Sequence, residues 1–300
     1  MNRDWRAELK RVLPHALLDE PLSRHTTFKI GGPADVLIDA RSVAEAQTAL
    51  RLAAAAGRPA FVLGWGSNLL VRDRGVRGLV LRLAGEFERI DFLEGGRVRA
   101  GAAVRVPQLV VACAQKGLSG LEPIVGVPGT LGGALAMNAG TRDGEIGPLV
   151  LEIEAVDLSE GDVRRLVKDD LRFAYREGPL RGRAALSALL RLKPGDKGDI
   201  MAVVSRYQRK RQQTQPIHTY NVGSTFKNPP GRFAAQMIEE LGLKGYVVGG
   251  ARVSPLHANF IENFAGAKAA DVLALVDLIR ERVRAAIGVE LELEMRVVGE

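Results

Sequence analysis

The chain carries the glycine-rich loop Gly64-Trp65-Gly66-Ser67-Asn68 directly after a short apolar run, Ala60 to Leu63. Glycines let a backbone turn tightly and approach a ligand closely, and the exposed N–H groups of such a loop can bind phosphate oxygens. Ser67 and Asn68 add side-chain donors. The loop is not a Rossmann fingerprint, because Leu69 stands where the last glycine of that pattern belongs. A lone loop of this kind is better interpreted as a structural turn.

A second glycine-rich segment lies further along the chain, from Pro128 to Gly140. We expect its last part, Leu135 to Gly140, to form a short helix. The free N–H groups and positive end of a helix N-terminus suit a pyrophosphate. Neither loop matches the Walker A pattern. Together the two loops favour a dinucleotide cofactor, with chance turns as the equal alternative that the residues alone leave open.

The apolar patterns around the loops predict an α+β chain with mixed or antiparallel sheets rather than a doubly wound one. Hairpin signals stand at Gly95-Gly96 and at Ser159 to Asp162, and Ser42 to Glu45 is a helix-start signature. We expect strands at residues 35–39, 60–63, 78–83, 87–94, 97–100, 151–158, 163–167, 184–192, 258–262 and 289–298. We expect helices from residue 42 to 57 and at residues 106–116, 200–212, 233–241 and 268–287.

Length and composition limit the class of protein. A chain of 300 residues suggests about two domains. Its 46% hydrophobic and 26% charged residues are typical of a globular protein that buries a sizeable core. The polar, turn-rich stretch Lys193 to Gly198 is the expected domain boundary. Cys113 is the single cysteine, which excludes an internal disulfide and predicts a buried structural thiol.

Two segments bear on cellular location. The charged N-terminus has no apolar region after it, so we expect no signal peptide. Pro123 to Gly140 lacks charge, yet its glycines and prolines would leave backbone groups unpaired in lipid. We therefore expect no membrane insertion and a cytoplasmic protein.

The net charge is +7, from 42 basic and 35 acidic residues, and favours anionic partners. The densest basic run is Arg206 to Arg211, for which the solvated face of a helix is the favoured interpretation. No zinc-finger, helix-turn-helix or RNA-binding motif accompanies it. We therefore expect no nucleic-acid partner, and a basic nucleic-acid-binding protein is the alternative from another class.

Three stretches contain residues suited to chemistry. Arg176, after Tyr175, could hold a carboxylate in a two-pronged hydrogen bond, although a surface salt bridge is the favoured reading of that pair alone. Gly223 to Pro229 places a hydroxyl, a cation and an amide beside a flexible glycine, which suits polar substrate recognition or a plain turn. Glu292 and Glu294 alternate with apolar residues, so we expect them on one strand face. The histidines lack metal-ligand spacing, and we expect no metal site.

In this order, the motifs resemble those of the UDP-N-acetylenolpyruvoylglucosamine reductase (MurB) family of bacterial peptidoglycan synthesis, over nearly the whole chain. The motifs that carry the resemblance are His25 to Asp35, Gly64 to Leu70, Gly126 to Gly133, Gly223 to Pro229, His257 to Asn263 and Leu291 to Gly299. The resemblance implies an N-terminal segment at residues 1–22 and a vanillyl-alcohol-oxidase-type (PCMH) FAD-binding domain at residues 23–195. It implies a smaller α+β substrate-binding domain at residues 196–300, which agrees with the boundary stretch.

The resemblance also implies a site and a reaction. The reaction is the FAD-dependent, NADPH-driven reduction of a UDP-sugar enolpyruvyl ether to the lactyl ether. Its implied catalytic residues are Arg176 and Glu294, which would stabilise an enolate, and Ser224, which would donate a proton. Its implied substrate contacts are Lys227 and Asn228. The implied FAD contacts are Gly64, Gly66, Ser67, Asn68, Leu69, Pro128, Gly129, Thr130, Gly132, Gly133, Asn138 and Gly140.

This sequence departs from the family pattern at two places. Glu177-Gly178-Pro179 follows Arg176 where the family has a serine nearby, which affects local substrate contacts and leaves Arg176 in place. Leu293 stands where proline or threonine is common. The short separation between Arg176 and Ser224 resembles the short-form subfamily without a tyrosine-bearing loop. A sugar or lactone oxidase of the same superfamily is the competing flavin enzyme, and the motifs from Gly223 onward argue against it.

Overall fold

The computed structural model describes residues 4–300, so the predicted N-terminal segment 1–22 begins outside the described residues. The chain divides into two compact units. The first comprises residues 4–19, 35–65 and 78–210, and the second comprises residues 20–34, 66–77 and 211–300. Both units combine helices with sheets, which confirms the predicted α+β class. The division into domains at residues 195 and 196 stays a prediction.

The first unit contains a five-stranded sheet in which all neighbours pair antiparallel. Its strands, in order across the sheet, are β12 (Val163–Val167), β11 (Val150–Asp157), β13 (Arg183–Arg191), β7 (Arg97–Gly101) and β6 (Ile90–Leu93). Leu93 of β6 pairs with Arg97 of β7, so the loop between them has three residues, Glu94 to Gly96, rather than two, and Gly95 and Gly96 both adopt φ +70° in it. Both predicted hairpins are therefore confirmed.

A four-stranded sheet has the order β1 (Leu17–Pro21), β2 (Pro33–Ala40), β5 (Val76–Leu83) and β3 (Ala60–Val62), with β3 and β5 parallel. Helix α2 (Val43–Ala55) connects β2 to β3 and begins at Ser42, whose hydroxyl accepts from the N–H of Glu45 at 3.3 Å. The helix ends before Gly57, which adopts φ +64°. The helix-start signature in the sequence is thus confirmed, because the serine supplies the acceptor that the first turn lacks.

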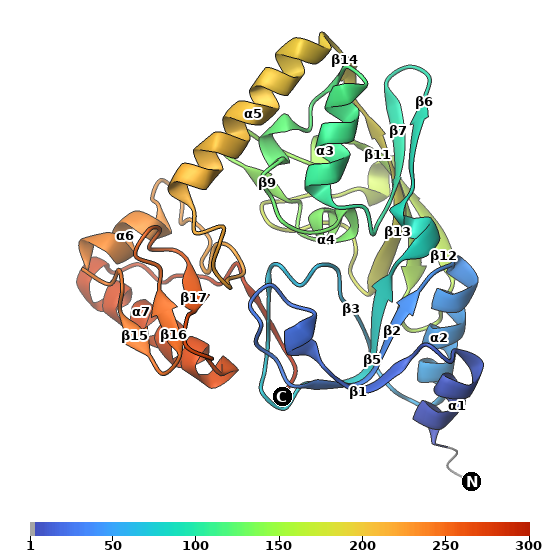
Figure 1. Cartoon of the computed structure of the whole chain (residues 1–300), viewed down its shortest axis with the longest axis horizontal. Coiled ribbons are helices and arrows are strands. Elements are labelled where there is room, and N and C mark those ends of the chain that lie inside the picture. Colours follow the sequence, from blue (N-terminus) through green and yellow to red (C-terminus); the bar gives the residue numbers. More distant parts are fainter. Residues whose placement is uncertain (1–3) are drawn as a thin grey trace. The chain divides into compact units, whose positions relative to one another are not determined.

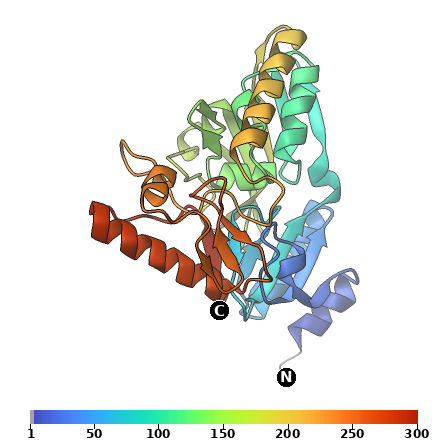
Figure 2. The ribbon, with the colours of Figure 1, turned by 60° about the vertical axis from the view of Figure 1, so that its left-hand side comes forward.

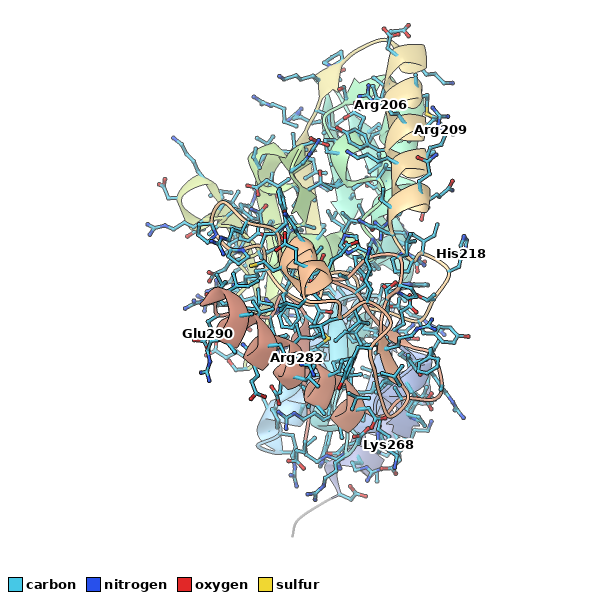
Figure 3. The ribbon with its side chains drawn as sticks, turned by 90° about the vertical axis from the view of Figure 1, so that its left-hand side faces the viewer. Arg206, Arg209, His218, Lys268, Arg282 and Glu290 are labelled. Carbon is cyan, nitrogen blue, oxygen red and sulfur yellow. The ribbon has the colours of Figure 1, made fainter. Side chains whose placement is uncertain are left out.

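Helices α3 (Val106–Gln115) and α5 (Lys197–Thr214) lie side by side in both views of the ribbon (Figures 1 and 2). Cys113 of α3 and Val204 of α5 belong to one buried core with residues of β7, β11 and β13. Figure 3 shows Arg206 and Arg209 on α5, and both side chains are exposed. The basic run is therefore solvated at Arg206, Arg209 and Lys210, as predicted, whereas Arg211 is half-buried and burial lowers its pKa to about 10.

The second unit has its own core, built around α7 (Ala269–Ile287). Phe28, Phe226 and Ile279 are among its fully buried members. α7 ends at Gly288, whose φ of +72° closes the helix in the left-handed conformation. This unit also holds α6 (Ala234–Glu240) and the antiparallel sheet of β15 (Val247–Val248), β16 (Ala251–Val253) and β17 (Ile261–Asn263).

A pair of short parallel strands, β4 (Leu69–Val71) and β18 (Arg296–Val298), brings the end of the chain beside the first glycine-rich loop. The remaining elements are α1 (Trp5–Val12), α4 (Leu131–Ala136), β8 (Leu118–Ser119), β9 (Gly140–Thr141), β10 (Gly144–Glu145), β14 (Lys193–Pro194) and the 3-10 turns η1 (Leu22–Arg24), η2 (Gly85–Glu88), η3 (Glu122–Ile124), η4 (Gly147–Leu149) and η5 (Lys168–Asp170).

Several element boundaries differ from expectation. The strand expected at residues 87–94 is regular only at Ile90–Leu93, because Gly85–Glu88 forms the 3-10 turn η2. α4 lies at Leu131–Ala136, not at residues 135–140, because Thr130 accepts from a helix N–H and starts the helix inside the glycine-rich segment. The final strand is regular only at Arg296–Val298, since its partner β4 has three residues. β17 begins at residue 261 rather than 258, because the N–H of Phe260 donates to the carbonyl of His257 within a turn and so cannot pair with another strand.

Candidate active site

The two glycine-rich segments meet within the first unit at Gly64 and Thr130. A Cβ atom on Gly64 would lie 2.8 Å from Thr130 Oγ1, so a side chain at that position would press on the second segment. Thr130 is buried, and its hydroxyl accepts from the N–H of Gly133 at 3.5 Å. Gly64 and Gly133 are exposed. At the meeting point Gly64 and Gly133 therefore present bare backbone to solvent.

Other glycines of the second segment are required by packing. Gly129, at φ +131°, accepts from the N–H of Val106 at 3.0 Å. The N–H of Gly132 donates to Ala102 at 2.8 Å, and a Cβ there would lie 3.1 Å from the Ala102 methyl. A Cβ on Gly140 would meet the Cβ of Glu145 across the β9–β10 hairpin. These glycines hold the segment in its path.

The later part of the first loop belongs to the second unit. Gly66 adopts φ +64°, and a Cβ there would lie 2.6 Å from the carbonyl oxygen of His25. The Gly66 carbonyl accepts from the N–H of Thr27 at 3.2 Å, and the Thr27 hydroxyl also donates to Asn221 at 2.7 Å. Thr27 thus ties this loop to the segment that leads into Ser224. Sequence reasoning did not single it out beyond its place in the His25 to Asp35 motif.

Arg176 lies at the tip of a tight turn in the first unit. Ala174 and Glu177 exchange two backbone hydrogen bonds, at 2.9 and 3.0 Å, on either side of it. Arg176 adopts φ +59°, a left-handed conformation that costs a side-chain-bearing residue of order 1–3 kcal/mol and concentrates at functional sites. Its guanidinium carbon lies 4.9 Å from the centre of the Tyr175 ring. The turn presents the two side chains that the sequence singled out.

The Arg176 turn is anchored to the second glycine-rich segment. Asn138 is fully buried; its Nδ2 donates to the carbonyl of Ala174 at 3.0 Å, and its Oδ1 accepts from Gly147 at 3.0 Å. The N–H of Gly178 donates to Ala136 at 3.1 Å, and any Cβ on Gly178 would collide with the Leu135 carbonyl oxygen. Within the departing stretch Glu177-Gly178-Pro179, the glycine is therefore required by the close packing of this turn on α4.

Ser224 and Glu294 come from segments that pair within the second unit. The N–H of Glu294 donates to the carbonyl oxygen of Thr225 at 2.9 Å, and Phe226 and Leu293 form an isolated antiparallel bridge. The carbonyl oxygen of Glu294 in turn accepts from Asn68 Nδ2 at 3.0 Å. The structure thus brings together three predicted site residues from widely separated stretches of the sequence.

Asn259 fixes the backbone next to Ser224. It is 3% exposed; its carbonyl accepts from the N–H of Thr225 at 2.8 Å. Its side-chain Oδ1 accepts from the N–H of Phe226 at 2.9 Å, and its Nδ2 donates to the Phe226 carbonyl at 2.8 Å. Asn259 stands in the His257 to Asn263 motif, which is a weak signal of a functional role, but the motif does not reveal these three hydrogen bonds.

Lys227 and Asn228 have partners within the second unit. Lys227 Nζ lies 3.1 Å from Glu292 Oε2 in an ion pair whose carboxylate is exposed. Asn228 Oδ1 accepts from the N–H of Ala234 at 3.0 Å and so helps to start α6. The Glu292 and Glu294 carboxylates were expected to share a strand face, but neither residue belongs to a regular strand, since β18 begins at Arg296; Glu292 is exposed and Glu294 is half-buried.

Burial shifts the pKa of several side chains, among them Cys113 and His257. Cys113 is fully buried, and burial, reinforced by Glu122, raises the pKa of its thiol to about 12, as a structural thiol requires. Burial lowers the pKa of His257, whose Nδ1 accepts from the N–H of Asn259 at 3.3 Å. Within residues 4–300 no three His, Cys, Asp or Glu side chains gather as metal ligands. Among the helices of the same residues, none is both long and apolar enough to cross a membrane.

Family models match both parts of the chain. Residues 34–167 match an FAD binding domain. Residues 215–298 match the C-terminal domain of UDP-N-acetylenolpyruvoylglucosamine reductase. The first match contains Gly64, Thr130 and the segment between them, and the second contains Ser224, Asn259 and Glu294.

Full-length relatives agree with these matches. The chain is 44% identical to UDP-N-acetylenolpyruvoylglucosamine reductase 2 of Symbiobacterium thermophilum, over 93% of this chain and 91% of that protein. It is 44% identical to the reductase of Rubrobacter xylanophilus, over 97% of this chain and 98% of that one. The crystal structure of the reductase from Thermus caldophilus superposes with a TM-score of 0.80 at 38% identity, covering 95% of this chain and 98% of that chain.

Proposed function

The chain belongs to the UDP-N-acetylenolpyruvoylglucosamine reductase family, and we propose that Arg176, Ser224 and Glu294 carry its reaction. The protein is an FAD-dependent oxidoreductase that uses NADPH to reduce UDP-N-acetylglucosamine enolpyruvate to UDP-N-acetylmuramate, a precursor of peptidoglycan. Its fold is a vanillyl-alcohol-oxidase-type FAD-binding domain with a smaller α+β substrate-binding domain. A cytoplasmic location is part of the proposal.

The residues of the two glycine-rich segments fit an FAD pyrophosphate. Gly64 and Gly133 are exposed without side chains, and a Cβ on Gly64 would encroach on Thr130, so substitution would fill the space that a phosphate needs. Ser67 and Thr130 supply hydroxyl groups. We assign the FAD contacts to Gly64, Gly66, Ser67, Asn68, Leu69, Pro128, Gly129, Thr130, Gly132, Gly133, Asn138 and Gly140, with Asn138 acting through its buried hydrogen bonds.

The chemistry demands two things of the protein. When bound, FAD supplies the hydride that NADPH provides and that the vinyl C3 of the substrate accepts. The chain must then stabilise negative charge at C2 and the carboxylate, and must deliver a proton to C2. Arg176 offers a guanidinium for the carboxylate, and Glu294, in its protonated form, offers a hydrogen bond there. Arg176 belongs to the first unit, whereas Ser224 and Glu294 belong to the second.

Ser224 is the proposed proton donor. A serine hydroxyl is a weak acid, so this role needs a strongly basic enolate and tight positioning. The observation that carries the proposal is the backbone pairing of Glu294 with Thr225 at 2.9 Å, which places Ser224 beside the segment of the glutamate. Asn259 supports the role, since its three hydrogen bonds hold the two residues that follow Ser224. Lys227 and Asn228, in the same loop, are the proposed substrate contacts.

Single-turnover kinetics of Ser224→Ala tests this role. We expect NADPH to bleach the flavin absorbance of the variant at the native rate, because Ser224 has no part in that half-reaction. Recovery of the absorbance by the enolpyruvyl substrate is expected to slow by about 100-fold or more, the scale of a lost general acid. Ser159→Ala, which removes an exposed hydroxyl from the hairpin of the first unit, is the matched control. Native recovery in Ser224→Ala would remove the serine from the mechanism.

A further inference from the structure

Arg105 lies where the two glycine-rich segments meet, and sequence reasoning gave it no role. It forms an isolated antiparallel bridge with Thr130, and the residue after it, Val106, donates to Gly129 at 3.0 Å. Its guanidinium carbon lies 3.1 Å from the centre of the Trp65 ring, in the other segment. Arg105 therefore contacts both segments within the first unit, beside the point where Gly64 faces Thr130.

The guanidinium of Arg105 lacks an anionic partner within residues 4–300. Its Nε atom is buried without a hydrogen bond, and burial alone, with no nearby carboxylate, lowers its pKa. A buried donor left unsatisfied destabilises the fold, and more so when the group is charged. The fold thus keeps a partly buried cation whose donors are not used by the protein.

Helix capping does not explain an arginine at this position. Arg105 is the N-cap of α3, where Ser, Thr, Asp and Asn are preferred because their side chains accept from the first turn. An arginine side chain can only donate, and Arg105 makes no capping hydrogen bond. The stacking on Trp65 instead fixes the plane of the guanidinium, while 44% of the Trp65 surface stays exposed.

We infer that Arg105 binds a phosphate group of the dinucleotide held by the Gly64 and Thr130 segments, with Trp65 holding its guanidinium in place. The planar fork of an arginine matches two phosphate oxygens, and stacking it beforehand reduces the freedom lost on binding. The phosphate also supplies the negatively charged partner that the guanidinium lacks within the protein. This inference rests on the proposed assignment of the two segments to FAD.

The retention of FAD tests the inference without recourse to turnover. The holoenzymes of wild type, Arg105→Gln and Arg105→Lys are diluted, and the fluorescence of released flavin gives the Kd at low and high salt. A charged hydrogen bond to phosphate predicts an FAD Kd about 10- to 100-fold higher for Arg105→Gln, with weaker salt dependence. Arg105→Lys, which keeps the charge and loses the fork, is expected to fall between the two. Arg191→Gln, which removes an exposed charge from β13, is the control and is expected to match wild type.

Three outcomes contradict the inference. One is an FAD Kd in both Arg105 variants within about twofold of wild type, with native salt dependence. The second is unchanged FAD retention with a raised KM for NADPH or for the UDP-sugar, which would assign Arg105 to the phosphates of those molecules instead. The third is equal weakening by Arg105→Lys and Arg105→Gln with lowered unfolding temperatures of both apoproteins, which would make the residue structural.

Gly64→Val separates this inference from the assignment beneath it. A bulky side chain there would collide with Thr130 and occupy the meeting point of the segments. If Gly64→Val loses FAD while Arg105→Gln keeps it, the inference about Arg105 alone fails. If Gly64→Val retains FAD at the native Kd, the assignment of the segments to FAD fails first.

Discussion

The backbone N–H of Glu294 donates to the carbonyl oxygen of Thr225 at 2.9 Å, and this bond joins the proposed acid to the segment of the proposed proton donor. The carbonyl of the same glutamate accepts from Asn68 at 3.0 Å, so the first glycine-rich loop is held at the same place. Thr27 adds a link from Gly66 to Asn221, just before the Ser224 loop. A change in any of these segments should therefore alter the position of Ser224.

Asn259→Leu is expected to impair the half-reaction that depends on Ser224 more than the other. The change leaves the buried N–H and carbonyl of Phe226 without hydrogen-bond partners, which lowers the free energy of unfolding by about 1–3 kcal/mol per group. The freed backbone would misplace Ser224, so recovery of flavin absorbance by the substrate should slow about tenfold or more, with bleaching by NADPH unchanged. Rapid-mixing absorbance and thermal unfolding measure both effects.

Val283→Ala is the control for Asn259→Leu. Val283 is fully buried in α7 in the same core, so its truncation lowers stability without removing any hydrogen bond of the Ser224 loop. If this variant slows substrate-dependent recovery as much as Asn259→Leu does, lost stability explains the effect and Asn259 has no positioning role.

Gly178→Ala is expected to disturb the Arg176 turn. The added methyl would collide with the Leu135 carbonyl and push the turn away from α4. We expect a lowered melting temperature together with a reduced kcat. Gly182→Ala, four residues on, meets open space and has only the cost of a positive φ, about 1–2 kcal/mol. Equal kcat values for the two variants would show that close packing at Gly178 is not needed to position Arg176.

The stability of the protein should fall as the pH drops below about 6.5, in part through His257. Burial lowers the pKa of this histidine from its ordinary value of 6.5, so the unfolded state binds its proton first. The stabilisation is present above 6.5 and is lost as the pH falls toward the folded pKa. Denaturant unfolding of wild type and His257→Gln between pH 8 and pH 5 measures it, and the variant should lose less stability over that range. Parallel curves for the two proteins would exclude the histidine as a source.

Cys113 should resist thiol reagents in the folded protein. Its thiol is fully buried, and its pKa of about 12 leaves almost no thiolate near neutral pH. We expect labelling by a chromogenic disulfide to proceed only at the rate of unfolding, and to become immediate in denaturant. Rapid labelling of native protein at pH 7 would contradict the buried structural role.

The sequence predicted most of the regular elements, because apolar periodicity and glycine punctuation are local signals. The hairpin at Gly95-Gly96 and the helix start at Ser42 are examples. The helix expected at residues 135–140 was misplaced, because the glycines at 132 and 133 argue against a helix there, whereas Thr130 caps α4 and starts it at Leu131.

Non-local relationships could not be read from the sequence. The resemblance supplied Arg176, Ser224 and Glu294, while the contacts that hold them come from residues far away in the chain. Asn259, Thr27 and Arg105 act through backbone bonds or ring stacking, which leave no periodic pattern. An arginine at a helix start looks unremarkable until its lack of a partner is seen.

An anaerobic absorption spectrum distinguishes this reductase from its alternatives in one experiment. We expect a yellow protein with bound FAD that NADPH bleaches and that the enolpyruvyl UDP-sugar recolours in the absence of oxygen. A flavin that only oxygen recolours would indicate an oxidase of the same superfamily and would contradict the account, as would a colourless protein that binds DNA in a salt-dependent way.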